Sequence, residues 1–329
     1  MEAVLVVGSQ LSFEHLLDSA KAMAESSRLR ILLLLRQGEA TVSDLTAILD
    51  QSQPRVSRHL KVLMEAGLVG RYQEGAWAYF HLTDDSGARG LCDSVLDTLD
   101  ETDAQFVADR ERLAAIRDSR AARAGAYFAA NAEEWDRIRS LHAPDASVEQ
   151  ALKELIGDRP VDTMLDIGTG TGRMITLFSP LFRRAVGIDT SREMLTIARS
   201  RLEEAGPVPA QLRQASVFDL PVGPESVDLI TIHQVLHYLD QPGRAVQQAA
   251  EALRPAGRMA IIDFQSHDLE FLRSEFAHLR LGFSDAQMSE WLDLAGLKVV
   301  NRHTIAPSQA GQELTVNIWL AMKEAAGGR

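Results

Sequence analysis

The stretch MLDIGTGTGR, residues 164–173, decides the fold of the carboxy-terminal half of the chain. An apolar run ends near Asp166 and leads into a turn with three glycines, Gly168, Gly170 and Gly172. Glycines between a strand and a helix let the backbone approach a ligand closely. About 20 residues later a second apolar run ends at Asp189, where a carboxylate can accept hydrogen bonds from both ribose hydroxyls of a nucleoside. These residues predict a nucleoside site at the ends of two strands.

Around this turn, apolar strands alternate with helical segments. The expected strands are TMLDIG (163–168), AVGIDT (185–190), AQLRQA (210–215), VDLITIH (227–233) and GRMAIIDF (257–264). Such alternation is typical of a parallel sheet covered by helices on both faces, a Rossmann-like α/β fold. A dinucleotide fingerprint would place glycine where this chain has Arg173, so the pattern favours a nucleoside without a pyrophosphate over NAD.

The amino-terminal part is expected to contain short helices joined by tight turns, at residues 13–24, 26–38, 41–50 and 52–67. In the last of them an inner apolar stripe follows helical spacing and consists of Val56, Leu60 and Leu63. The segment LVGRYQEGAWAYFHL, residues 68–82, alternates around Glu74 and Gly75 as a β-hairpin does. Together these elements predict an α+β winged helix-turn-helix domain.

Charge is distributed unevenly along the chain. The net charge of −12 argues against nonspecific polyanion binding by the whole protein, but eight basic residues outnumber six acidic ones between Lys21 and Leu82. The outward face of the 52–67 helix suits a DNA major groove, where arginine reads guanine and glutamine reads adenine. The residues expected to contact bases are Gln53, Arg55, Ser57, Arg58 and His59. Lys61 and Arg71 are expected to bind phosphates.

The stretch SRLRILLLLRQGEATVSDLTAILDQSQPRVSRHLKVLMEAGLVGRYQEGAWAYFHL resembles the ArsR family of winged-helix regulators. The resemblance implies a dimer that represses by covering a promoter and leaves the DNA when an effector binds. Many metal sensors of this family carry Glu-Leu-Cys-Val-Cys-Asp before the recognition helix, whereas this chain reads EATVSD, with the poor metal ligands Thr41 and Ser43 at the cysteine positions. No histidine between His81 and His142 could form the family's other metal site. We therefore expect no metal and an effector site elsewhere in the chain.

The segment from Arg213 to Phe264 resembles the later motifs of class I S-adenosylmethionine-dependent methyltransferases, and the resemblance spans residues 161–264. It implies that Asp166 and the glycine turn hold the methionyl end and Asp189 the ribose, with the adenine near Ser216. Many relatives have Asp at that last position, so a neutral hydroxyl there implies modestly lower affinity. The residues expected to bind S-adenosylmethionine or S-adenosylhomocysteine are Asp166, Gly168, Thr169, Gly170, Gly172, Asp189, Thr190, Met194, Ser216, Val217, Phe218, His233 and Gln234.

The segment YFAANAEEWDRIRSLH, residues 127–142, resembles the helix that precedes and covers the cofactor site in these enzymes. Its Tyr127 and Trp135 either cover the ligand or pack the helix onto the sheet. Three histidines are candidates for acid–base catalysis, with a structural role as the alternative, namely His233, His237 and His278. Arsenite methyltransferases hold arsenic with several cysteines, and the only cysteine here is Cys92, so arsenic methylation is not expected.

The sequence leaves two functions open. One is a regulator whose methyltransferase-fold domain senses S-adenosylmethionine or S-adenosylhomocysteine, and the other is a small-molecule methyltransferase that carries its own repressor. A DNA-anchored modifier of nucleic acid or protein is disfavoured, because residues 233–236 read HQVL where amino methyltransferases place an Asn-Pro-Pro-Tyr type of signature.

The length of 329 residues predicts about two domains. We expect the DNA-binding domain at 1–84, a proline-free helical dimerisation and connecting segment at 85–144, and the methyltransferase domain at 145–329. A single cysteine favours a reducing compartment, and no apolar run reaches the roughly 18 to 20 residues that span a bilayer. The expected protein is a cytoplasmic homodimer that binds double-stranded operator DNA and no membrane.

Overall fold

The computed structural model describes residues 11–83, 85–135, 138, 145–206, 208–307 and 314–324. The chain forms two compact units, Met1–Ser119 and Arg120–Arg329, and the division falls inside the 28-residue helix α6 (Ala104–Asn131). The three-part boundaries at 84 and 144 stay a prediction, and His142 lies outside the described residues. Each unit is described below by itself.

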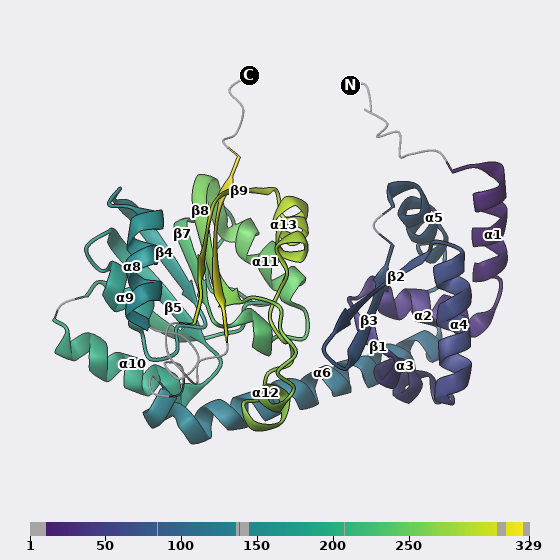
Figure 1. The fold of residues 1–329 in the computed structure, drawn as a ribbon, viewed down its shortest axis with the longest axis horizontal. Coiled ribbons are helices and arrows are strands. Elements are labelled where there is room, and N and C mark those ends of the chain that lie inside the picture. The colour runs from purple at the N-terminus through teal and green to yellow at the C-terminus, as the bar shows by residue number, and fades with distance from the viewer. Residues whose placement is uncertain are drawn as a thin grey trace. The chain divides into compact units, whose positions relative to one another are not determined.

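Unit 1 is a set of short helices with a small antiparallel sheet of order β1-β3-β2 (Figure 1). Its elements are α1 (Phe13–Met23), α2 (Ser26–Arg36), β1 (Ala40–Thr41), α3 (Val42–Leu49), α4 (Gln53–Glu65), β2 (Val69–Glu74), β3 (Trp77–Leu82), α5 (Ser86–Leu96) and the first part of α6. The turn between β2 and β3 consists of Gly75 and Ala76, one residue later than the sequence pattern indicated, because Glu74 still pairs with Trp77.

Local chemistry fixes the helix boundaries of unit 1. The Thr41 hydroxyl accepts from the Asp44 N–H, and the Asp44 carboxylate accepts from the Thr41 N–H, which forms a capping box at the start of α3. Pro54 stands in the first turn of α4, where its missing N–H costs nothing. Side chains of α2, α3 and α4 form the core, and the completely buried ones include Ile31, Leu45, Ile48, Val56 and Leu63.

Unit 2 is built on a seven-stranded sheet of order β6-β5-β4-β7-β8-β10-β9. Its elements are the rest of α6, η1 (Ala132–Glu134), α8 (Asp145–Ile156), β4 (Val161–Ile167), α9 (Arg173–Phe178), β5 (Phe182–Asp189), α10 (Arg192–Glu204), β6 (Ala210–Gln214), β7 (Val227–His233), η2 (Leu236–Tyr238), α11 (Pro242–Ala252), β8 (Leu253–Phe264), α12 (Phe271–Glu275), α13 (Asp285–Leu294), β9 (Leu297–Ile305) and β10 (Val316–Lys323). Helices α8, α9 and α10 cover one face of the sheet, and α11 and α13 cover the other (Figure 1).

Five strands of this sheet are parallel, at the positions that the sequence predicts. The sheet also contains two strands that the sequence did not predict, and β10 pairs antiparallel with both β8 and β9. The edge strand β9 exposes almost every residue between Leu297 and Ile305, so it lacks the apolar run of a buried strand. The carboxyl ends of β4, β5, β7 and β8 meet at one edge, where ligands of open α/β sheets bind.

Candidate cofactor site and DNA-binding surface

The outer face of α4 carries polar side chains because its apolar residues face the core. Val56, Leu60 and Leu63 are buried along one side of the helix. The residues left exposed on α4 are Gln53, Arg55, Ser57, Arg58 and Lys61. Arg71 on β2 is exposed as well, and its guanidinium donates to the Gln73 side chain. This surface has the residue types that contact bases and phosphates in a major groove.

His59 does not belong to this surface, and its predicted contact with DNA is contradicted by its burial. The residue is 9% exposed, and its Nδ1 lies 3.5 Å from a carboxylate oxygen of Glu25. Burial lowers the pKa of the His59 imidazole, although the Glu25 carboxylate acts in the opposite direction. His59 is three residues after Val56 and four before Leu63, so it lies on the buried side of α4.

The glycine turn after β4 requires its three glycines. Gly168, Gly170 and Gly172 have φ angles of 68°, 51° and 81°, in the left-handed region that favours glycine. A Cβ on Gly168 would lie 2.3 Å from a methyl carbon of Val235, so a side chain cannot be accommodated there without movement. A Cβ on Gly170 would lie 3.7 Å from the indole nitrogen of Trp135. Trp135 therefore lies next to the glycine turn, and its role in covering a ligand stays a prediction.

Asp189 lies at the end of β5 and organises the same turn. One carboxylate oxygen accepts from the Gly170 N–H at 2.9 Å and the other accepts from the Ser191 N–H at 2.9 Å. Burial raises the pKa of the Asp189 carboxyl, and these backbone N–H groups oppose the change. Each oxygen has a second lone pair, so the carboxylate can still accept from hydroxyl groups of a ligand.

Three buried polar atoms beside the turn lack a hydrogen bond of good geometry among the described residues, although the Thr169 side chain is close enough to Asp166 to oppose the rise of its pKa. They are Oδ2 of Asp166, Oγ1 of Thr169 and Nε2 of Gln234. Burial raises the pKa of the Asp166 carboxyl to about 6, against the hydrogen bond that Thr231 donates to its Oδ1 at 2.6 Å. Buried polar atoms without a hydrogen bond lower the stability of the fold, and their clustering at the carboxyl ends of strands is typical of a ligand site. Two acceptors and one amide donor fit the amino-acid end of S-adenosylmethionine or S-adenosylhomocysteine, so the site fits that cofactor.

The remaining predicted cofactor residues differ in their exposure. Met194 and Val217 are buried, Thr190 is exposed, and Phe218 and His233 are half-buried. The Ser216 hydroxyl accepts from the Phe218 N–H at 3.2 Å, so this loop is held by its own serine. The assignments to adenine and to the pocket lining stay predictions.

Aromatic rings continue from Trp135 away from the glycine turn. The ring of Phe128 lies 5.2 Å from that of Trp135 and 4.7 Å from that of Tyr238, in edge-to-face arrangements. Tyr127 contacts Phe128 with a centroid distance of 6.0 Å. Sequence reasoning missed Phe128 and Tyr238, because an aromatic residue in an apolar segment looks the same whether it packs or lines a site.

Two of the three candidate histidines meet at the far end of this aromatic cluster. Nδ1 of His237 lies 2.6 Å from Oδ1 of Asp263, with both side chains at most 1% exposed, and the His278 ring is 4.2 Å from the His237 ring. Because a carboxylate only accepts, the pair leaves Nε2 of His237 as the basic nitrogen. Asp263, which sequence reasoning missed, follows the apolar run MAII at the end of β8, the same signal that marked Asp166 and Asp189.

The described residues contain no group of three or more His, Cys, Asp or Glu side chains arranged to hold a metal ion. No helix among them is long and apolar enough to span a bilayer.

Comparisons with known proteins agree with the two parts of the chain. Residues 25–70 match the family model described as bacterial regulatory protein, arsR family, and residues 165–261 match the model described as methyltransferase domain. The Escherichia coli arsenical resistance operon repressor is 43% identical over 74 residues, which are 22% of this chain and 63% of that protein. The uncharacterized methyltransferase YcgJ of Bacillus subtilis is 30% identical over 133 residues, which are 39% of this chain and 53% of that protein.

The chain thus spans between about half and two thirds of the length of these curated relatives. Among solved structures, a chain of the complex with the Haloferax volcanii Trm112 methyltransferase activator superimposes with a TM-score of 0.51 at 20% identity. The match covers 60% of this chain and 97% of that one, and it concerns the fold alone. The protein combines an ArsR-family winged helix-turn-helix domain with a class I methyltransferase fold.

Proposed function

We propose that this protein is an ArsR-type repressor whose methyltransferase-fold domain binds S-adenosylmethionine or S-adenosylhomocysteine and couples that binding to operator affinity. The observation that carries the proposal is helix α6, a single 28-residue helix whose first part belongs to unit 1 and whose second part belongs to unit 2. Its two halves make different sets of contacts.

Three side chains of the first half of α6 form ion pairs or hydrogen bonds with the helix-turn-helix. Asp109 forms a two-point ion pair with Arg30 of α2, with distances of 2.6 and 2.7 Å. Arg112 donates to the Ile48 carbonyl at 2.6 Å, near the end of α3, and Arg117 donates to the carbonyl of Gln37, just after α2. Arginines at the ends of helices also interact favourably with the helix dipole. A displacement of α6 would therefore act on the helices that support α4.

The second half of α6 belongs to the candidate cofactor site. Arg120 forms an ion pair with Asp240, and Tyr127 and Phe128 belong to the aromatic cluster that reaches Trp135 next to Gly170. A ligand that displaces or orders Trp135 changes the environment of these rings. Since allostery requires an element with contacts that differ between two states, α6 is our candidate for that element.

The residues of the site have separate roles in this proposal. Asp189 binds the ribose, Asp166 and the Gln234 amide bind the amino-acid end, and the glycines allow the backbone to approach. Apolar residues on α1, namely Phe13, Leu16 and Leu17, are exposed, which supports a homodimer as the DNA-binding form.

A second function is favoured by one observation, the buried pair of His237 and Asp263. When bound, S-adenosylmethionine would supply a methyl group activated on a sulfonium. In an active small-molecule methyltransferase, the aromatic cluster would hold the acceptor and Nε2 of His237 would accept its proton.

Calorimetry tests the main proposal. S-adenosylhomocysteine is titrated into the full-length protein with and without operator DNA from its own promoter. Coupling requires the DNA to change the cofactor affinity by the same factor as the cofactor changes the DNA affinity. Asp189→Ala should weaken cofactor binding by about 1.5 to 3 kcal/mol per lost hydrogen bond, whereas Asp189→Asn, which keeps one acceptor, should lose less.

The matched control is Asp219→Ala, which removes an exposed carboxylate from the loop after β6 and should leave both affinities unchanged. Tight cofactor binding that leaves DNA affinity untouched would remove the sensor function and leave the enzyme function standing. Absence of cofactor binding would remove both.

A further inference from the structure

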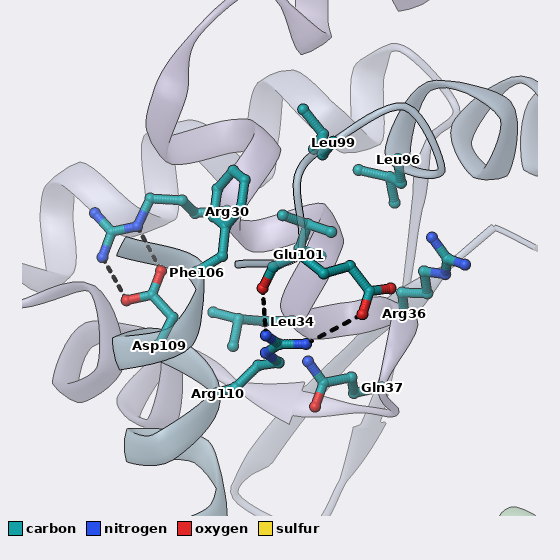
Figure 2. Close-up of a pocket in the computed structure, with 11 residues that line it drawn as sticks. Arg30, Leu34, Arg36, Gln37, Leu96, Leu99, Glu101, Phe106, Asp109 and Arg110 are labelled. Carbon is teal, nitrogen blue, oxygen red and sulfur yellow. Dashed lines mark hydrogen bonds and ion pairs between the residues drawn. The ribbon is translucent and has the colours of Figure 1, made fainter. Parts of the chain in front are cut away.

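Unit 1 contains a cavity of its own, away from the glycine turn. It has a volume of about 320 Å³, is open to solvent, and is lined by the end of α2, the end of α5, the following turn and the start of α6 (Figure 2). The lining residues are Arg30, Leu33, Leu34, Arg36, Gln37, Leu96, Leu99, Glu101, Phe106, Asp109 and Arg110. Ligand sites for small molecules begin at about 300 Å³, so the cavity has room for one small ligand.

The inner wall of the cavity is apolar. Leu34 and Leu96 are each 2% exposed, and the partly buried Leu33, Leu99 and Phe106 line the same cavity. Figure 2 shows the Phe106 ring and the leucine side chains around the same space. An aliphatic or aromatic group bound here would be removed from water, at about 25 cal/mol per Å² of apolar surface buried.

The charges around the cavity leave cations available for a ligand. Arg30 is neutralised by its two-point ion pair with Asp109, and because this pair is buried it forms part of the cavity wall. Arg36 instead pairs with Asp97, whose side chain is 61% exposed, and Arg110 pairs with Glu101, whose side chain is 83% exposed. Ion pairs with exposed partners contribute little, about 0 to 1 kcal/mol, so a ligand anion can replace those carboxylates.

We propose that this cavity binds a small organic anion with one carboxylate on an aliphatic or single-ring aromatic body, at a site separate from the cofactor site. The apolar body lies against Leu34, Leu96 and Phe106, and the carboxylate accepts from the guanidinium groups of Arg36 and Arg110. Guanidinium groups form two-point hydrogen bonds with carboxylates, which favours this anion over a halide. A neutral ligand of the same shape lacks that interaction.

The location of the cavity gives such a ligand a consequence for DNA binding. Arg36 ends α2 and Arg110 belongs to α6, so one carboxylate that binds both residues links the two helices. Helix α2 packs against α4, the helix with the exposed arginines. The ligand is therefore a second input to the helix-turn-helix, and it does not depend on the coupling proposed for the cofactor.

Phenylacetate and its neutral isostere phenylacetamide are the probes. Each is titrated calorimetrically into the full-length protein, and operator affinity is then measured at saturating phenylacetate. Phenylacetate should bind at least about tenfold more tightly than the amide, because charge-assisted hydrogen bonds are worth about 1.5 to 3 kcal/mol. Arg110→Gln and Arg36→Gln should each weaken phenylacetate about tenfold and leave the amide unchanged.

Two further variants make the test specific. Arg89→Gln removes an exposed arginine of α5 that does not line the cavity, and phenylacetate should bind it as it binds the wild type. Asp189→Ala should also bind phenylacetate normally, whatever happens to its cofactor affinity. The proposal is overturned by equal binding of the two probes, by no binding at millimolar concentration, or by loss of phenylacetate binding in Asp189→Ala.

Discussion

The recognition helix α4 and the glycine turn after β4 present their functional groups in opposite ways. On α4, Arg55 and Arg58 extend into solvent and are replaceable one by one without disturbing the core. At the turn, Asp166 and Gln234 are buried with polar atoms that lack a hydrogen bond of good geometry among the described residues. An exposed surface binds its ligand through charge and hydrogen bonds, whereas a buried site must also match the shape of its ligand. The turn should therefore be far less tolerant of substitution than the helix face.

Replacing one glycine of the turn should have the largest effect. Gly168→Ala adds a Cβ that lies 2.3 Å from a Val235 methyl carbon and forces alanine into a φ of 68°. The left-handed conformation costs about 1–2 kcal/mol and overpacking about 1–3 kcal/mol of stability. We expect a drop of about a hundredfold in S-adenosylhomocysteine affinity, about 2.7 kcal/mol, measured by calorimetry next to thermal unfolding.

Gly157→Ala separates backbone strain from the clash. Gly157 has a φ of 71°, but no described atom lies within 4 Å of an added Cβ. This variant should lose only the strain energy and keep its cofactor affinity. The double variant Gly168→Ala with Val235→Ala removes the clash and should restore part of the affinity. If Gly157→Ala loses cofactor affinity and the double variant recovers none, close packing at the turn does not govern cofactor binding.

On the exposed face of α4, Arg55→Ala and Arg58→Ala should each weaken operator binding by about 1–3 kcal/mol if these arginines read bases. Fluorescence anisotropy at one fixed salt concentration measures the effect, because affinity for DNA depends on salt. Arg199→Ala removes the same charge from an exposed position on α10 and should change little. His59→Gln alters a buried neighbour on α4 and should stay within about twofold, about 0.4 kcal/mol. Unchanged binding by both arginine variants would exclude them from the interface.

Sequence reasoning worked where one local pattern carries the information. Helical spacing placed Val56 and Leu60 inside and Arg55 outside, and apolar runs ending in aspartate located Asp166 and Asp189 at strand ends. It assigned His59 to the surface, because a histidine beside arginines was read by its neighbours and not by its angular position on the helix.

Features that depend on long-range contacts were not predictable in this way. The antiparallel strands β9 and β10 follow from pairing across the sheet, and β9 alone has no buried pattern. The pair of His237 and Asp263 joins residues 26 positions apart, and nothing in either local segment indicates the other. The cavity in unit 1 likewise brings together three helices whose lining residues look like ordinary amphipathic faces.

A pH dependence of about tenfold should belong to the buried site alone. Burial raises the pKa of Asp166 from its usual value of 3.8 to about 6. Without ligand, a raised carboxyl pKa means that stability is greatest below pH 3.8 and falls as the pH rises through about 6, because ionisation is unfavourable in the interior. A ligand ammonium group favours the ionised form, so cofactor affinity should change in the opposite direction and fall as the pH falls through about 6. Between pH 7 and pH 5 the ionised fraction drops about tenfold, and S-adenosylhomocysteine affinity should follow.

Asp189 also has a raised pKa, so Asp166→Asn is needed to assign the effect: it should remove most of the pH dependence and give, at pH 7, an affinity close to that of the wild type at pH 5. Operator binding through Arg55 and Arg58, measured without cofactor, should not follow this curve, because arginine stays charged throughout the range. A wild-type cofactor affinity that is equal at pH 5 and pH 7 would show that the Asp166 carboxylate does not bind a cation of the ligand.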